Sequence, residues 1–176
     1  MNGITWSVME VELVRASVDE KVVLQRMMEL YLYDFSELED MDLNADGLFG
    51  YPYLDHNWTE ETRHPFIIRV AGKLAGFVLV RQLATEPKAV QGIAEFFVMR
   101  KYRRLGVGQQ AAQTVFDRFA GSWEIGVLRS NVGAQGFWRS VVGKYTMGRY
   151  TETDMETSDE GWEGILLRFE NSQQQT

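Results

Sequence analysis

The run Arg103-Arg104-Leu105-Gly106-Val107-Gly108 is the segment whose residue types and spacing most clearly indicate ligand chemistry. It follows residues typical of a strand, and residues 107–119 after it have apolar positions at helical spacing. The first amides of a helix lack an intrahelical acceptor, and the helix dipole adds partial positive charge there. Glycines carry no Cβ, so a pyrophosphate can approach the backbone, and the two arginines add formal charge. The segment therefore predicts a phosphate-binding loop between a strand and a helix.

Other glycine-rich loops share part of this pattern. Gly106-x-Gly108-x-x-Ala111 loosely fits a dinucleotide fingerprint, but in that fold the strand runs directly into the first glycine, whereas here residues 100–105, with four basic side chains, intervene. A Walker A loop requires Gly-Lys-Ser/Thr, which is absent. The glycines could also merely punctuate a turn between a strand and a helix. The loop alone leaves that interpretation open.

The elements that must position this loop can be predicted from hydrophobic periodicity and breaker residues. Strands are expected at residues 11–16, 66–70, 74–82, 92–99, 123–128, 145–150 and 165–169, and helices at residues 19–34, 107–119 and 131–142. Residues 71–73 form a hairpin turn, residues 35–62 a short helix plus loops, and residues 86–91 and 151–163 loops. Meander strands are antiparallel, whereas the strand-helix-strand step after residue 92 favours a parallel pair. The expected class is α/β (α+β), a mixed sheet with helices on its faces.

Two motifs resemble those of the GNAT family of N-acetyltransferases. Residues 95–108 resemble the family's central motif, and Asn131-x-x-Ala134-x-x-Phe137-Trp138-Arg139 resembles its second cofactor motif, an Asn-x-x-Ala-x-x-Phe-Tyr helix. The expected order of elements also matches, and the resemblance extends over residues 11–169. It implies the GNAT fold, a mixed, mostly antiparallel sheet of six to seven strands flanked by about four helices. We expect one such domain over residues 8–170 and a disordered tail at residues 171–176.

The resemblance implies acetyl-CoA as co-substrate. The backbone of the central strand is expected to pair with the pantetheine arm, the loop amides to hold the pyrophosphate, and the helix after Asn131 to flank the arm. The expected cofactor-binding residues are Phe97, Val98, Arg103, Arg104, Leu105, Gly106, Val107, Gly108, Gln109, Asn131, Ala134, Phe137 and Trp138.

Glu95 is the expected catalytic base, because it is the only carboxylate on the central strand. The implied reaction is direct attack of a primary amine on the thioester in a ternary complex. Polyamine acetyltransferases of the family have a similar Glu-Asp-Phe-Phe-Val-Met run, in which the acid that acts as base corresponds to Ala94. Strict alternation puts Glu95 on the face of Phe97 and Met99, and a bulge could re-aim it. Two alternatives to Glu95 as base stay open. Glu95 could only bind the acceptor ammonium or close a surface pair, and water could carry the proton to a more distant acid.

Trp138 stands where the family has a tyrosine that serves as general acid. An indole N–H donates a hydrogen bond but does not titrate. Either the thiolate leaves unprotonated or another tyrosine serves. We assign Tyr145 as the catalytic acid, with the alternatives Tyr150, Tyr31 and Tyr33.

Residues 34–62 are acidic and aromatic, with nine Asp and Glu residues and no Lys or Arg. Carboxylates beside aromatic faces suit a cationic amine, although a solvated acidic loop over core aromatics gives the same pattern. Tyr31, Tyr33 and Glu95 are the expected acceptor-binding residues. Asp42-x-Asn44-x-Asp46-Gly47 begins like a calcium loop, but Tyr53 replaces the glutamate required at the twelfth position, which favours an Asx turn.

Composition restricts the function classes further. The 176 residues include no cysteine and only two histidines, so no disulfide, thiolate site, cysteine nucleophile, histidine cluster or catalytic metal is expected. The net charge of −7 argues against nucleic acid as a partner, and no apolar run approaches the ~20 residues of a membrane span. We expect a cytoplasmic protein, and a homodimer stays open.

Three functions agree with these features of the sequence. The first is acetyl transfer to a primary amine, either a small cationic amine or the amino terminus of a peptide. The second is a non-catalytic acyl-CoA-binding module, which Trp138 and Ala94 motivate. The third is a protein-interaction domain with a decayed cofactor site.

Overall fold

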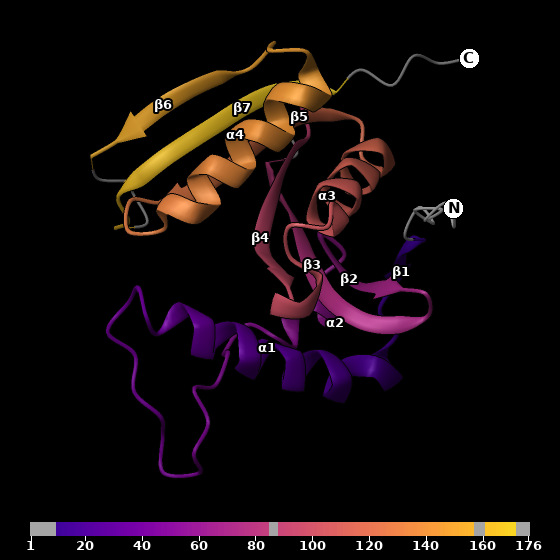
Figure 1. Cartoon of the computed structure of the whole chain (residues 1–176), viewed down its shortest axis with the longest axis vertical. Helices are drawn as coiled ribbons and strands as arrows, with labels where there is room; N and C mark the ends of the chain where they lie inside the picture. Colours follow the sequence, from indigo (N-terminus) through magenta and orange to yellow (C-terminus); the bar gives the residue numbers. More distant parts are fainter. Residues whose placement is uncertain (1–9, 85–87, 157–160, 172–176) are drawn as a thin grey trace, which may run out of the picture.

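A computed structural model describes residues 10–84, 88–156 and 161–171, which form a seven-stranded sheet in the order β1-β2-β3-β4-β5-β7-β6 (Figure 1). The strands are β1 (Val11–Arg15), β2 (Arg63–Val70), β3 (Lys73–Ala84), β4 (Val90–Val98), β5 (Gly121–Leu128), β6 (Thr151–Met155) and β7 (Gly164–Asn171). The helices are α1 (Lys21–Phe35), α2 (His56–Thr59), α3 (Val107–Arg118) and α4 (Val132–Thr146), with short 3-10 turns at Val18–Glu20 and Arg100–Tyr102. Among the described strands, only β4 and β5 pair in parallel, so the expected mixed, mostly antiparallel sheet is confirmed.

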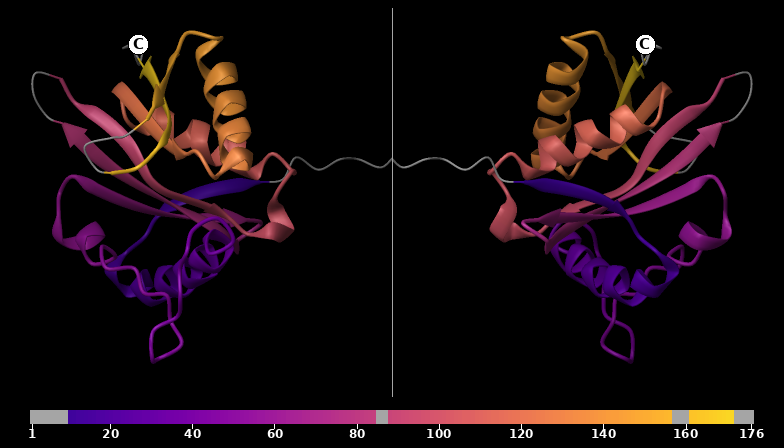
Figure 2. Two further views of the ribbon diagram at one scale, coloured as in Figure 1. Left: turned by 90° about the vertical axis from the view of Figure 1, so that its left-hand side faces the viewer. Right: turned by 90° about the vertical axis from the view of Figure 1, so that its right-hand side faces the viewer.

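Helices cover both faces of the sheet, and each face has its own core. α3 and α4 pack on one face around Phe116, Trp123 and Trp138. α1 and the segment that follows it pack on the other face, around Leu24, Met28 and other buried side chains. The two side views show the sheet between these layers (Figure 2). Within the described part of the chain, no helix is long and apolar enough to cross a membrane.

The sheet opens between β4 and β5. These strands pair only over residues 90–92 of β4 and residues 122–124 of β5. β5 continues in register with β7 along its whole length, whereas the rest of β4 keeps only its β3 neighbour among the described strands. One edge of β4 therefore carries backbone groups that no described strand uses, at the centre of the molecule.

The expected strand at residues 145–150 is wrong, because α4 continues through Tyr145 to Thr146 and β6 starts only at Thr151. The helix ends where Met147 and Gly148 adopt positive φ angles of 52° and 80°, and the Gly148 amide bonds back to the Gly143 carbonyl at 2.8 Å. Gly148 is thus the C-terminal helix signal that the strand prediction overlooked.

Three smaller boundaries also differ from expectation. β6 occupies the start of the expected loop at residues 151–163, and β4 begins at Val90 inside the expected loop at residues 86–91. Asn171, the expected start of the tail, is the last residue of β7. Its side chain donates to the Phe116 carbonyl in the core, which explains why a polar residue continues the strand. Residues 172–176 of the expected tail lie outside the described residues.

Candidate active site

The loop before α3 has the backbone of an anion-binding site. Arg104 and Gly106 have φ angles of 61° and 81°, so the chain turns sharply into the helix. The first amide to bond back is that of Gln110, to the Gly106 carbonyl at 3.0 Å. The amides of residues 107–109 precede this bond and are available to a ligand, at the positive end of the α3 dipole.

Gly108 allows α3 and α4 to meet at the mouth of this loop. A Cβ at Gly108 would lie 3.0 Å from Cε2 of Phe137 and 3.5 Å from Cγ2 of Val98. The first distance is tighter than ordinary van der Waals contact, so only glycine fits without moving the ring. The sequence pattern predicted a close ligand approach here, and the structure adds a close approach of helices.

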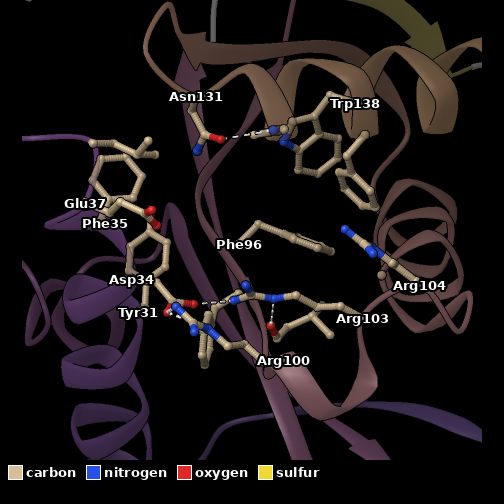
Figure 3. A pocket seen from close by; sticks show the side chains of 17 residues that line it. Tyr31, Asp34, Phe35, Glu37, Phe96, Arg100, Arg103, Arg104, Asn131 and Trp138 are labelled. Carbon is tan, nitrogen blue, oxygen red and sulfur yellow. Dashed lines mark hydrogen bonds and ion pairs between the residues drawn. The ribbon is translucent and has the colours of Figure 1, made fainter.

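A cavity of about 560 Å³ extends from this loop between α1, β4 and the start of α4 (Figure 3). Nine of the expected cofactor-binding residues line it: Phe97, Val98, Arg103, Arg104, Gly108, Asn131, Ala134, Phe137 and Trp138. The other four do not. Leu105 is exposed, Val107 is buried in the core and Gly106 caps the helix, while the Gln109 side chain accepts a hydrogen bond from Lys144 at 3.0 Å.

The open edge of β4 runs along this cavity. The Met99 amide donates to the Ala75 carbonyl of β3 at 2.8 Å. Since backbone groups alternate in direction along a strand, those of Val98 and Phe96 point away from β3. Nε of Arg103 donates to the Val98 carbonyl at 2.7 Å, which agrees with this direction. The Val98 amide and both backbone groups of Phe96 are thus the groups that an added strand-like ligand can reach.

Asp34 ties the basic loop to the end of α1. Its carboxylate accepts from Arg100 at 2.7 Å and from Arg103 at 2.5 Å (Figure 3). Burial acts to raise the pKa of Asp34, but the hydrogen bonds and charges of Arg103 and Arg100 outweigh it and lower the pKa. Asp34 therefore stays ionised and fixes two cationic side chains at the cavity wall.

Asn131 and Trp138 form the α4 side of the cavity. Oδ1 of Asn131 accepts from the Ala134 amide at 3.0 Å, so this side chain caps the helix. Trp138 is only 5% exposed, and its ring meets those of Phe96 and Phe137 edge-on, with centroids 5.0 Å apart in both pairs. The tryptophan thus forms a packed apolar wall.

A bulge in β4 lies directly before Glu95, which stays on the face of Phe97 as strict alternation puts it. Leu79 of β3 pairs with Glu95 and Val80 pairs with Ile93, which leaves Ala94 as an extra residue. Ala94 packs against the α1-side core, and Glu95 bonds to a side chain of α1, so two consecutive residues face the same layer. The bulge that the sequence left open is therefore present.

The Glu95 carboxylate is held by tyrosines. The Tyr31 hydroxyl donates to Oε2 at 2.6 Å, and Tyr51 is a second hydroxyl partner. Burial raises the pKa of Glu95, and the opposing effects of Tyr31, Tyr51 and the charge of Arg81 do not cancel that rise. Burial and the charge of Glu95 also raise the pKa of Tyr31, so this hydroxyl keeps its proton. A carboxylate with a raised pKa beside a neutral donor is suited to accept a proton and return it.

Glu95 lies where two further cavities meet. A cavity of about 620 Å³ shares Tyr31, Phe96 and Trp138 with the first cavity and includes Glu95. A third, of about 610 Å³, shares Glu95 and Tyr51 with the second. The three cavities follow the opening of the sheet from the α3 loop, past Glu95, to the opposite face.

Two expected site residues lie elsewhere. Tyr33 is 65% exposed, because residues two apart on a helix do not share a face and Tyr31 occupies the inner one. The Tyr145 hydroxyl donates to Asp117 at 2.8 Å, and burial followed by this hydrogen bond raises its pKa. Neither tyrosine is among the residues that line the three cavities.

The carboxylates of the acidic segment lie at several separate places. Asp55 pairs with Lys21 at 2.6 Å, and the exposed Asp46 donates its amide to an Asx turn at Asn44. Glu39 accepts from Ser130 at 2.9 Å, across the opening of the sheet. Four carboxylates of this segment line the first two cavities, those of Asp34, Glu37, Glu39 and Asp40. Sequence reasoning grouped Asp34 with the acceptor site, whereas it belongs to the cofactor side.

An opened mixed sheet, an anion-binding loop and a partly buried glutamate between connected cavities are typical of the acyltransferase class. The chain belongs to the GNAT acetyltransferase family, since the model described as Acetyltransferase (GNAT) family matches residues 24–143. None of the curated proteins compared with the chain matches it in sequence.

Solved structures share the fold at low sequence identity. An acetyltransferase from Thermus thermophilus is 15% identical, with 93% of this chain and 98% of that chain covered and a TM-score of 0.67. The ribosomal-protein-S18-alanine N-acetyltransferase from Escherichia coli is 15% identical, with 93% and 96% covered and a TM-score of 0.59. An aminoglycoside acetyltransferase from an uncultured soil metagenomic sample, in complex with sisomicin, is 14% identical, with 74% and 86% covered and a TM-score of 0.58.

Proposed function

We propose that the protein transfers an acetyl group from acetyl-CoA to a primary amine by direct attack in a ternary complex. The observation that carries this proposal is the position of Glu95, at the junction between the cavity of the basic loop and the two cavities beyond it. An amine that enters from the far side reaches Glu95 before it reaches the cofactor side.

The residues of the first cavity fit the chemistry of a CoA thioester. Available amides and Arg104 suit a pyrophosphate. The unpaired edge of β4 suits the amide groups of a pantetheine arm, and Phe96, Phe137 and Trp138 supply apolar contact. Acetyl-CoA in this position supplies the thioester carbonyl carbon that the amine attacks.

Glu95 and Tyr31 account for the protons of the reaction. The amine nitrogen forms a bond to the carbonyl carbon, and the C–S bond breaks with its electron pair on sulfur. Glu95 takes the proton of the amine and so loses the negative charge that contributes to the raised pKa of Tyr31, and Tyr31 then gives its hydroxyl proton to sulfur. Glu95 then returns a proton to Tyr31 along their 2.6 Å hydrogen bond. Tyr31 lines the cofactor cavity and Tyr145 does not, so Tyr31 is the better acid where Trp138 replaces the family tyrosine.

Acetyl transfer is tested by thiol release from acetyl-CoA with a panel of primary amines. We expect turnover by the wild-type protein and a loss of about 10²-fold or more in kcat for Glu95→Gln. Calorimetric titration should show the same acetyl-CoA affinity for both proteins, because Glu95 is not among the residues of the first cavity. The wild-type protein could instead turn over no amine faster than Glu95→Gln does and still bind acetyl-CoA normally. That result would favour the non-catalytic acyl-CoA-binding module that Trp138 and Ala94 motivate.

A further inference from the structure

The two arginines of the loop before α3 lead in different directions. In Figure 3 the side chain of Arg103 extends to Asp34 on α1, whereas that of Arg104 lies beside Phe96 on the α3 side of the cavity. Within the described part of the chain, Arg104 has no hydrogen-bond or ion-pair partner. The sequence predicted a phosphate-binding role for both charges, but the structure leaves only Arg104 uncommitted.

The guanidinium of Arg103 is held on two sides. Its Nε donates to the Val98 carbonyl at 2.7 Å, and its Nη2 donates to Oδ2 of Asp34 at 2.5 Å. The other oxygen of Asp34 accepts from Arg100 at 2.7 Å, which fixes the carboxylate in turn. Cζ of Arg103 also lies 5.7 Å from the centre of the Phe97 ring. Two of the three guanidinium nitrogens are therefore engaged by protein oxygens before any ligand binds.

Arg103 closes the last acceptor on the open edge of β4. Val98 is the final residue of this strand, and its carbonyl points into the opening of the sheet. A ligand that paired with this carbonyl in strand fashion would bring its N–H group along the direction that Nε of Arg103 already occupies. The usable edge is thus limited to the Val98 amide and the two backbone groups of Phe96.

The end of the usable edge determines the register of a bound arm. Backbone groups that point the same way recur at every second residue, so an arm shifted by one repeat moves by about 6.6 Å. Attack on the thioester requires the reacting atoms to lie about 3–3.5 Å apart, so a shifted thioester is out of reach of an amine at Glu95. A pyrophosphate held at the loop prevents the arm from moving far toward Glu95, but a flexible arm can still fold back toward the loop. Arg103 stands in the way of that shift.

From these contacts, and resting on the proposed acetyl transfer, we propose that Arg103, held by Asp34, is a positioning residue that sets the register of the pantetheine arm on β4. It withholds the Val98 carbonyl and so confines the arm to the groups that leave the thioester beside Glu95. Phosphate binding is left to the loop amides and Arg104.

Acetyl-pantetheine separates the arm from the phosphates, because it carries the same thioester arm without them. Arg104→Met should raise KM for acetyl-CoA about tenfold at unchanged kcat and have no effect with acetyl-pantetheine. Arg103→Met should lower kcat with both thioesters by about two- to tenfold, since a shifted arm gains one hydrogen bond to the Val98 carbonyl. KM should fall together with kcat, because the shifted arm binds without reacting. A raised KM for acetyl-CoA alone, or an unchanged kcat, would overturn the proposal.

Arg103→Lys distinguishes position from charge. Lysine keeps the positive charge, but it lacks the planar fork that reaches Val98 and Asp34 at once. We expect kcat and KM to fall together as in Arg103→Met, and to fall less in Asp34→Asn, which weakens only one of the two contacts. Wild-type kinetics of Arg103→Lys would show that charge alone suffices and would refute the positioning role.

A readout by NMR does not require turnover. In the CoA-bound wild-type protein, the Nε–H group of Arg103 should exchange with solvent at least as slowly as in the free protein, because its bond to the Val98 carbonyl persists. Faster exchange at saturating CoA would mean that the arm displaces Arg103, against the proposal. Slow exchange without thiol release on any amine would contradict only the acetyl transfer. Failure of CoA to bind in calorimetric titration would refute both.

Discussion

Glu95 and Tyr31 form a contact in which both partners are held by the fold before any ligand binds. Strand alternation places Glu95 on the α1 side of β4, on the face of Phe97, and Tyr31 is fixed by rings of both neighbouring strands, Phe77 and Phe97, with centroids 5.9 Å away in each case. A pair positioned in this way loses little freedom during the reaction. Its protonation states therefore govern the predictions that concern single residues.

Tyr31→Phe removes the hydrogen bond and keeps the ring. Since that bond opposes the rise in the pKa of Glu95, its loss should raise this pKa further. We expect the acidic limb of the pH profile of kcat/KM to move to higher pH and kcat on the plateau to fall about 10²-fold. Tyr145→Phe is the control and should change neither by more than about twofold. If Tyr145→Phe lost activity and Tyr31→Phe did not, Tyr145 and not Tyr31 would be the acid.

Glu95→Gln should change stability in a direction set by linkage. The raised pKa means that the folded protein binds this proton more tightly than the unfolded chain does. The resulting stability is fully present below the ordinary glutamate pKa and is lost as the pH rises through the folded value. We therefore expect Glu95→Gln to have a higher Tm than the wild type at about pH 8, with the gain shrinking toward pH 4. The surface control is Glu61→Gln. If it also raised the Tm at about pH 8, the higher Tm would come from the change in net charge and not from the pKa of Glu95.

The elements around the cofactor cavity depend on short-range signals, and these were largely readable from the sequence. The strand-loop-helix unit that ends in α3 and the helix expected from residue 131 were predicted because their residues lie close together in the chain. Side-chain partners far apart in sequence were not: Asp34 and Arg103 are 69 residues apart, and Arg63 meets Arg81 through strand register. The strand expected at residues 145–150 failed because apolar alternation outweighed the glycine at position 148.

Gly106→Ala tests the turn into α3. The φ angle of 81° is disfavoured for alanine, although a Cβ there would meet only the end of the Gln110 side chain, at 3.7 Å. We expect a loss of about 1–2 kcal/mol in the free energy of unfolding, together with weaker CoA binding. Both quantities can be measured, by chemical denaturation and by calorimetric titration.

Gly136→Ala is the matched control within a helix. Gly136 lies in the interior of α4, and a Cβ there would meet nothing within 4 Å. Alanine should therefore stabilise the protein by about 0.5–1 kcal/mol and leave CoA binding unchanged. Equal effects of the two substitutions on CoA binding would contradict a special role for the backbone at position 106.

For the whole molecule, the opened sheet predicts which amides a bound CoA protects. The Val98 and Phe96 amides point toward the opening, whereas the Phe97 amide is directed to β3. Hydrogen exchange followed by NMR should show slower exchange at Val98 and Phe96 when CoA is added, with little change at Phe97. CoA at 100 times its Kd should also stabilise the protein by about 2.7 kcal/mol. Protection confined to the α3 loop would indicate that the arm does not follow β4.

The position of the unpaired edge of β4 has a consequence for self-association. A free strand edge at the rim of a sheet can add a strand from another molecule and begin aggregation. Here the rims are β1 and β6, and β6 carries the charged side chains Glu152 and Asp154, which discourage such pairing. The edge left open at Phe96 and Val98 lies inside the molecule, behind Trp138 and the end of α1. A thin, flexible chain can reach it, while a second protein's strand, with side chains on both faces, is kept out.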